Sequence, residues 1–167
     1  MGQIGIISDT HGIVPDAVGE FFGECEEIWH AGDIGDLKVL EELAMICPVK
    51  AVYGNIDGRE VRSRTSSLLV FEYDSLKIML KHIVGRPGKY NAESKEQIEK
   101  IRPTIVVAGH SHILSIKYDE KMKCLYINPG AAGKNGLHKA QTMVRLRIEK
   151  SEIKDAEVWE KARVKAF

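Results

Sequence analysis

Five short apolar runs of this sequence each end in histidine, carboxylate or amide side chains. The endings are residues 8–12 (SDTHG), 30–33 (HAGD), 53–57 (YGNID), 109–112 (GHSH) and His82. Helical patterns follow the first two runs, at residues 15–24 and 37–46. Strands that alternate with helices indicate βαβ units and a mostly parallel sheet. Because the carboxyl ends of parallel strands share one edge, where ligands bind, we expect these endings to meet there.

The second half of the sequence is richer in strand patterns. Residues 68–83 predict a hairpin that turns at Asp74 and Ser75. A charged helix is expected at residues 93–101, and Asp36 is expected to cap the earlier helix. Further strands are expected at residues 104–112, 113–119, 122–128, 140–149 and 152–159. No repeat or linker divides the chain, so we expect one domain over residues 1–167.

The composition argues against several classes of protein. Lysine plus arginine and aspartate plus glutamate both number 24, so bulk charge indicates neither a nucleic-acid nor a membrane surface. No apolar stretch approaches the roughly 18 residues of a membrane span, and we find no pattern of a secretion signal. The three cysteines are scattered without a CxxC spacing, which is typical of reduced thiols. We therefore expect an intracellular, cytoplasmic protein.

The polar side chains at the strand ends form a plausible set of metal ligands. They are two carboxylates, one amide and four imidazoles: Asp9, His11, Asp33, Asn55, His82, His110 and His112. Such oxygen and nitrogen ligands suit manganese, iron, zinc or nickel better than calcium. Seven ligands exceed one tetrahedral zinc site, whereas two metals that share a carboxylate would use them all. The DxH and HxH spacings fit, because residues two apart on an extended segment point to the same side.

The motifs DTHG, HAGD, GNID, the strand-end His82 and GHSH resemble, in order, those of the calcineurin-like metallophosphoesterase superfamily. Within it, the chain is most similar to the small single-domain phosphodiesterase branch. The match runs from Ile4 to Gly130, where INPG resembles the closing NPG motif of that branch. The resemblance implies an α/β fold, a four-layer α/β/β/α sandwich of two mixed sheets flanked by helices.

The resemblance also implies how the ligands divide between two divalent transition-metal ions. The first metal would be held by Asp9, His11, Asp33 and His112. The second would be held by Asn55, His82 and His110, with Asp33 as the bridge between the two. Manganese is the leading candidate, and nickel, zinc and iron are the alternatives.

The implied activity is that of a metal-dependent phosphoric ester hydrolase. A metal-bridging hydroxide would attack the phosphorus of a phosphodiester in line, and the metals would neutralise charge on the phosphoryl oxygens. Asp33, Asn55 and His110 are the predicted catalytic residues. A centre of two divalent metals, two aspartates and one hydroxide carries a charge of about +1, which matches a phosphodiester better than a monoester dianion.

Three departures from the family pattern affect the substrate. Ile56 occupies the position at which members with strong monoesterase activity often carry a histidine general acid, and isoleucine cannot donate a proton. Ile83 follows His82 where a glycine is expected. The residues after NPG, AAGKNGLHK, lack the Pro-Arg pair often seen there.

Several alternatives remain open from the sequence. The chain could be a non-catalytic interaction scaffold, as the retromer subunit of the same fold is, or a phosphomonoesterase or nuclease that uses the same site. A homodimer is possible but nothing specifies one. His30 either supports the site or packs, Asp57 either orients a ligand histidine or caps a turn, Asn128 could approach the site, and His138 is expected to be structural.

Overall fold

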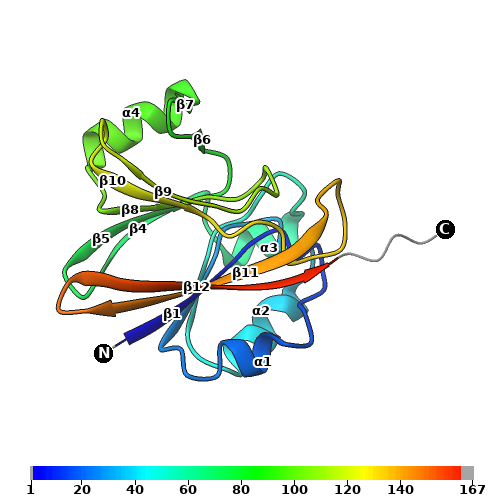
Figure 1. The fold of residues 1–167 in the computed structure, drawn as a ribbon. Coiled ribbons are helices and arrows are strands. Elements are labelled where there is room, and N and C mark those ends of the chain that lie inside the picture. Colours follow the sequence, from blue (N-terminus) through cyan, green and yellow to red (C-terminus); the bar gives the residue numbers. More distant parts are fainter. Residues whose placement is uncertain (1, 163–167) are drawn as a thin grey trace.

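The structure is a computed structural model that describes residues 2–162. The first of its two large sheets has the strand order β12-β11-β1-β2-β3. These strands are β1 (Gly2–Ile7), β2 (Glu27–His30), β3 (Val49–Ala51), β11 (Ala140–Glu149) and β12 (Glu152–Ala162). β1, β2 and β3 run parallel, whereas β11 is antiparallel to β1 and β12 is antiparallel to β11. Mixed pairing places the hairpin of the two long C-terminal strands at one side of the sheet (Figure 1).

The second sheet has the order β4-β5-β8-β10-β9. Its strands are β4 (Leu68–Tyr73), β5 (Leu76–Lys81), β8 (Ile105–Val107), β9 (Ser115–Asp119) and β10 (Cys124–Asn128). The three central strands β5, β8 and β10 are parallel, and the edge strands β4 and β9 are antiparallel to their neighbours. The mostly parallel pairing expected of the early strands holds for β1, β2 and β3, whereas the later strands form a second sheet that the strand pattern alone does not specify.

Helices cover the outer faces of both sheets, which gives four layers (Figure 1). The helices are α1 (Val18–Phe21), α2 (Leu37–Ala44), α3 (Arg59–Arg64) and α4 (Ala92–Ile101). A small hairpin of β6 (Gly85–Arg86) and β7 (Lys89–Tyr90) precedes α4. The predicted α/β/β/α sandwich is confirmed.

Three clusters of buried side chains separate the four layers. Strand β5 shows how one strand serves two of them: Ile78 and Leu80 pack between the sheets, whereas Met79 packs under α4 with Ile98. Side chains alternate in this way because successive residues of a strand point to opposite faces. A third cluster lies between the first sheet and its helices and includes Leu43 of α2.

Local signals in the sequence predicted most of these elements. The Asp36 carboxylate accepts a hydrogen bond from the Lys38 N–H (2.9 Å) and caps α2, as expected. Asp74 and Ser75 both have positive φ and join β4 to β5, so the predicted hairpin is confirmed. The helix expected over residues 15–24 is shorter, at Val18–Phe21, because the glycines of this segment are poor helix formers.

None of the helices within residues 2–162 is long and apolar enough to cross a membrane. Cys25, Cys47 and Cys124 are free thiols.

Candidate metal centre

The seven candidate ligands lie in the loops that follow five parallel strands. Asp9 and His11 follow β1, Asp33 follows β2, Asn55 follows β3, His82 follows β5, and His110 and His112 follow β8. The loops of the two sheets meet and bring six of these side chains into two clusters, Asp9–His11–His112 and Asp33–His82–His110. Within each cluster one ligand atom of every member lies within 4.8 Å of the others. Both clusters thus combine ligands from both sheets.

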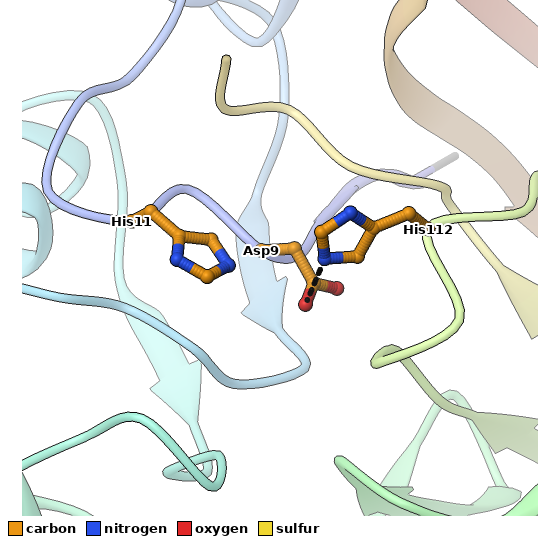
Figure 2. A group of neighbouring side chains, drawn as sticks. All are labelled: Asp9, His11 and His112. Atoms are coloured by element: carbon orange, nitrogen blue, oxygen red, sulfur yellow. Dashed lines mark ion pairs between the residues drawn. The ribbon is translucent and has the colours of Figure 1, made fainter. Parts of the chain in front are cut away.

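The first cluster contains buried polar atoms that have no hydrogen-bond partner among residues 2–162. Figure 2 shows the Asp9 carboxylate facing His112, whose Nε2 lies 3.2 Å from Asp9 Oδ1. Within the described residues, Asp9 Oδ1 and His11 Nε2 are buried and have no hydrogen-bond partner. The other carboxylate oxygen of Asp9 accepts hydrogen bonds from the Ser8 hydroxyl (2.6 Å) and the His110 N–H (3.1 Å). An unsatisfied buried carboxylate oxygen among imidazole nitrogens fits a divalent cation.

Asp33 faces both clusters with the same oxygen. Its Oδ2 lies 3.3 Å from His82 Nε2 in the second cluster and 3.6 Å from His11 Nε2 in the first. Its Oδ1 accepts a hydrogen bond from the Ile56 N–H (3.0 Å). Burial raises the pKa of the Asp33 carboxyl, but hydrogen bonds from His82 and Ile56 outweigh burial and hold this pKa below its ordinary value. This arrangement suits a carboxylate shared by two metals.

The ring of His82 is oriented by the backbone. Its Nδ1 lies 2.7 Å from the Ala31 carbonyl oxygen, which can only accept, so Nδ1 donates and Nε2 is left for the cluster. Nε2 faces two oxygens, Asn55 Oδ1 at 3.0 Å and Asp33 Oδ2 at 3.3 Å. Burial lowers the pKa of His82, but Asp33 and Asp9 outweigh burial and raise this pKa. The same surroundings that favour a proton on Nε2 favour a metal cation.

Asn55 completes the second cluster. Its Oδ1 lies 3.0 Å from His82 Nε2 and 3.0 Å from His110 Nδ1. The amide oxygen is therefore in reach of a cation held by the two imidazoles.

The backbone at the site is strained. Five of the seven candidate ligands have positive φ: Asp9, His11, Asp33, His110 and His112. A left-handed conformation costs a residue other than glycine about 1–3 kcal/mol, and such residues concentrate at functional sites. The expectation that the DxH and HxH pairs lie on extended segments is therefore wrong, because these loop residues turn through left-handed conformations.

The whole site lies within a segment that matches a known family. The sequence profile of the calcineurin-like phosphoesterase superfamily domain matches residues 3–151. The chain belongs to the calcineurin-like phosphoesterase superfamily. A probable metallophosphoesterase from Methanothermobacter thermautotrophicus is 32% identical over 160 residues, which cover 93% of this chain and 90% of that protein. A probable metallophosphoesterase from Methanocaldococcus jannaschii is 29% identical over 77% of this chain and 67% of that protein.

Solved structures share the same fold. An archaeal phosphodiesterase is 26% identical, covers 94% of this chain and 99% of its own chain, and superimposes with a TM-score of 0.70. Vps29 from Entamoeba histolytica in complex with zinc is 16% identical, covers 96% of this chain and 98% of its own, and has a TM-score of 0.73. The second likeness shows the fold alone.

In this member of the superfamily, His138 contacts a candidate ligand. Its Nε2 lies 2.8 Å from the Gly133 carbonyl oxygen and therefore donates, and its Nδ1 lies 3.0 Å from His112 Nδ1. A His138 ring that carries its hydrogen on Nε2 can accept at Nδ1 from His112 Nδ1–H, which leaves Nε2 of His112 for the first cluster. Gly136 lies against the same ring, because a Cβ atom there would be 2.5 Å from His112 Nδ1. No spacing pattern predicts this contact, because the two histidines are 26 residues apart.

His30 links the loops of the first two strands. It is fully buried, and its Nδ1 accepts a hydrogen bond from the Gly32 N–H (3.1 Å). Its Nε2 lies 3.0 Å from the Thr10 hydroxyl, which itself donates to the Ile34 carbonyl (2.9 Å). Burial lowers the pKa of His30 to about 4, so the ring is neutral and can donate once and accept once. These hydrogen bonds to two loops of the site fit the supporting role, the first of the two roles predicted for His30.

Asp57 and Asn128 bind backbone rather than ligand side chains. The Asp57 carboxylate accepts hydrogen bonds from the N–H groups of Ile34 (3.0 Å), Gly35 (2.8 Å) and Gly54 (2.8 Å). It therefore joins the loop of Asp33 to that of Asn55, and of its two predicted roles it has the capping one. The Asn128 amide donates to the Gly109 carbonyl (2.9 Å) and the Ser111 hydroxyl (3.0 Å), which fixes the GHSH segment.

Proposed function

We propose that the protein is a phosphodiesterase that uses two divalent transition-metal ions. The observation that carries this proposal is the position of Asp33 Oδ2 between two clusters of carboxylate and imidazole ligands. Membership of a phosphoesterase superfamily supports the reaction class, and the similarity to an archaeal phosphodiesterase supports the diester. Manganese is the metal we expect, because the ligand set mixes carboxylate, amide and imidazole.

The protein groups divide the work between holding cations and orienting substrate. Asp9, His11 and His112 would hold one cation, His82, His110 and Asn55 the other, and Asp33 both. Two cations so placed lower the pKa of a water molecule and neutralise charge on phosphoryl oxygens. The more exposed His110 and Asn55 lie where a phosphate would enter, so we assign both to substrate positioning as well.

Ile56 favours a diester over a monoester. Its side chain is 47% exposed beside Asn55, and its backbone N–H is already bonded to Asp33. Because this side chain cannot protonate a leaving group, the site suits esters whose leaving groups depart without much help. A diester also brings one negative charge instead of two to a centre of small net charge.

A paired assay tests the proposal. The purified protein is given an aryl phosphodiester and the matching monoester, after chelation and again after Mn²⁺ is restored. We expect metal-dependent cleavage with preference for the diester, and a loss of about a hundredfold or more in turnover for His110→Ala. His110 is exposed, so the variant should keep its circular dichroism spectrum and unfolding midpoint.

Two results would count against an enzyme. Turnover that His110→Ala leaves unchanged would remove the assigned centre from catalysis. Failure to cleave either ester with two metals bound would favour the interaction scaffold, a role compatible with the shared fold of Vps29.

A further inference from the structure

Large apolar side chains are exposed beside nearly every loop of the metal centre. Ile13 lies two residues after His11, and Ile56, Ile83 and Ile113 directly follow Asn55, His82 and His112, whereas Leu137 directly precedes His138. We call Ile13, Ile56, Ile83, Ile113 and Leu137 the apolar rim. Consecutive Cα atoms are about 3.8 Å apart, so each rim residue begins within about 8 Å of the backbone of a site residue.

The concentration of these residues is unusual. The described part of the chain exposes ten large hydrophobic side chains, and the rim accounts for five of them. Single exposed apolar side chains are normal, but a group of them around one centre indicates a contact surface. The loops that carry the rim are held by hydrogen bonds, for example from Ile56 N–H to Asp33 and from Ile113 N–H to the Ser111 hydroxyl (3.2 Å). The exposure therefore belongs to loops whose backbone is fixed.

A cavity of about 330 Å³ adjoins the second cluster and is lined in part by Asn55, His82 and Ile83. The two cations in its wall already have protein partners. Arg62 lies over the Tyr53 ring (4.4 Å) and donates from Nε to the Asp57 carbonyl. Lys81 donates to Glu93 (3.1 Å), Ser94 (3.0 Å) and Gln97 (2.8 Å) on α4. Because the Arg62 and Lys81 side chains are engaged by protein groups, they do not form a binding site for a second phosphate. The cavity therefore suits an uncharged group of the substrate.

We propose that the substrate is a phosphodiester with an apolar organic substituent, which packs on the apolar rim and enters the cavity at Ile83. The inference rests on the proposed phosphodiesterase activity and names the substrate class of that site. The basic side chains of the cavity wall are engaged by protein groups, whereas the rim offers side chains that gain by losing contact with water.

Binding tests the rim separately from turnover. Dimethyl phosphate and methyl octyl phosphate have the same charge and differ only in one chain, and both are studied as monomers by calorimetry with the Mn²⁺-loaded protein. We expect methyl octyl phosphate to bind about tenfold or more tightly, since part of its chain leaves water. Equal affinities would overturn the inference whatever the enzyme activity.

Variants of the apolar rim show where the octyl group of the ligand packs. In the double variant Ile83→Ser/Ile113→Ser, the ratio of the two affinities should fall to within about twofold of unity. Met45→Ser is the matched control, because Met45 is an exposed apolar side chain at the end of α2 outside the rim. If the double variant keeps the wild-type ratio of the two affinities, the octyl group binds elsewhere on the protein and the proposal is overturned.

Turnover of the p-nitrophenyl methyl and p-nitrophenyl octyl phosphodiesters tests the phosphodiesterase activity and the preference for an apolar substituent separately. Faster cleavage of the octyl ester supports both. Cleavage of both esters at equal kcat/KM would retain the phosphodiesterase and overturn the apolar substituent. Tighter binding of methyl octyl phosphate with cleavage of neither ester would overturn the phosphodiesterase and retain the rim as an apolar binding surface.

Discussion

His112 depends on a neighbour that offers no ligand atom to either cluster. His138 accepts the hydrogen of His112 Nδ1 and so leaves Nε2 for the first cluster. We predict that His138→Ala lowers the affinity of that cluster for Co²⁺ or Mn²⁺ by about 10–100-fold, which is typical when the partner of a ligand histidine is removed. Calorimetry and the visible spectrum of the Co²⁺ protein measure this.

The conservative variant separates orientation from packing. His138→Asn places an amide oxygen near the position of Nδ1, where it can still accept from His112, and should recover much of the affinity. Equal affinities for wild type, His138→Ala and His138→Asn would show that the contact does not orient the ligand.

His30 makes folding sensitive to acid. Its pKa is lowered from 6.5 to about 4 by burial, so the unfolded chain binds more protons than the folded chain between these values. Stability from this residue is present above pH 6.5 and is lost as the pH falls towards 4, by up to about 3 kcal/mol. Urea unfolding of the chelated protein at pH 7, 6, 5 and 4 measures the loss.

His30→Gln supplies the comparison, because glutamine can donate and accept but does not titrate over this range. The wild-type free energy of unfolding should fall more steeply than that of the variant between pH 6.5 and 4. Parallel curves would assign the acid sensitivity to other groups.

The sequence predicted the candidate ligands better than the residues that position them. The seven residues that the structure brings together could be predicted because each follows an apolar run and matches a family motif, and their role as metal ligands stays a prediction. His138 was missed as a site residue, since a contact across 26 residues leaves no periodic trace. Asp57 remained ambiguous because two of its three bonds, to the backbone of Ile34 and Gly35 in another loop, depend on tertiary structure.

At the scale of elements, Asp57 joins two loops that each carry a candidate ligand. Its buried carboxylate accepts from N–H groups in the loop after β2 and in the loop after β3. Asp57→Asn replaces one accepting oxygen by a donor, so we predict a loss of about 2 kcal/mol or more in the free energy of unfolding. Metal affinity should fall most at the cluster that contains Asp33 and Asn55.

Asp36→Asn is the matched control. Asp36 accepts one backbone N–H at an exposed helix cap, and asparagine caps helices about as well as aspartate. Denaturant unfolding should show little change for this variant. If Asp57→Asn lowers the free energy of unfolding as little as Asp36→Asn does, the two loops do not need the Asp57 carboxylate.

Elements were predictable where the chain has a periodic apolar pattern or special turn residues. The β4–β5 hairpin and the capped α2 belong to this group. α3 was missed because it buries only Val61. The β6–β7 hairpin was missed because its two-residue strands are too short to show alternation, although Gly88 in its turn has a positive φ.

At the scale of the molecule, the candidate centre lies where the two sheets meet. Asp9, His11, Asp33 and Asn55 come from loops of the first sheet, and His82, His110 and His112 from loops of the second. The shared carboxyl edge of parallel strands predicted that these loops converge, whereas the separation into two sheets followed only from the family resemblance. Bound metals would therefore cross-link the two halves of the sandwich.

Metal binding should stabilise the whole fold. A ligand that binds only the folded state adds about 2.7 kcal/mol at a free concentration of 100 times its Kd. We predict that Mn²⁺ raises the unfolding midpoint of the chelated protein and that renewed chelation reverses the rise.

Asp33→Ala should remove most of this shift, because Asp33 Oδ2 faces both clusters. The exposed Asp16 lies outside both clusters, so Asp16→Ala should keep the full shift. A shift of equal size in Asp33→Ala would place the stabilising metal elsewhere on the chain, and the bridge between the sheets would have to be abandoned.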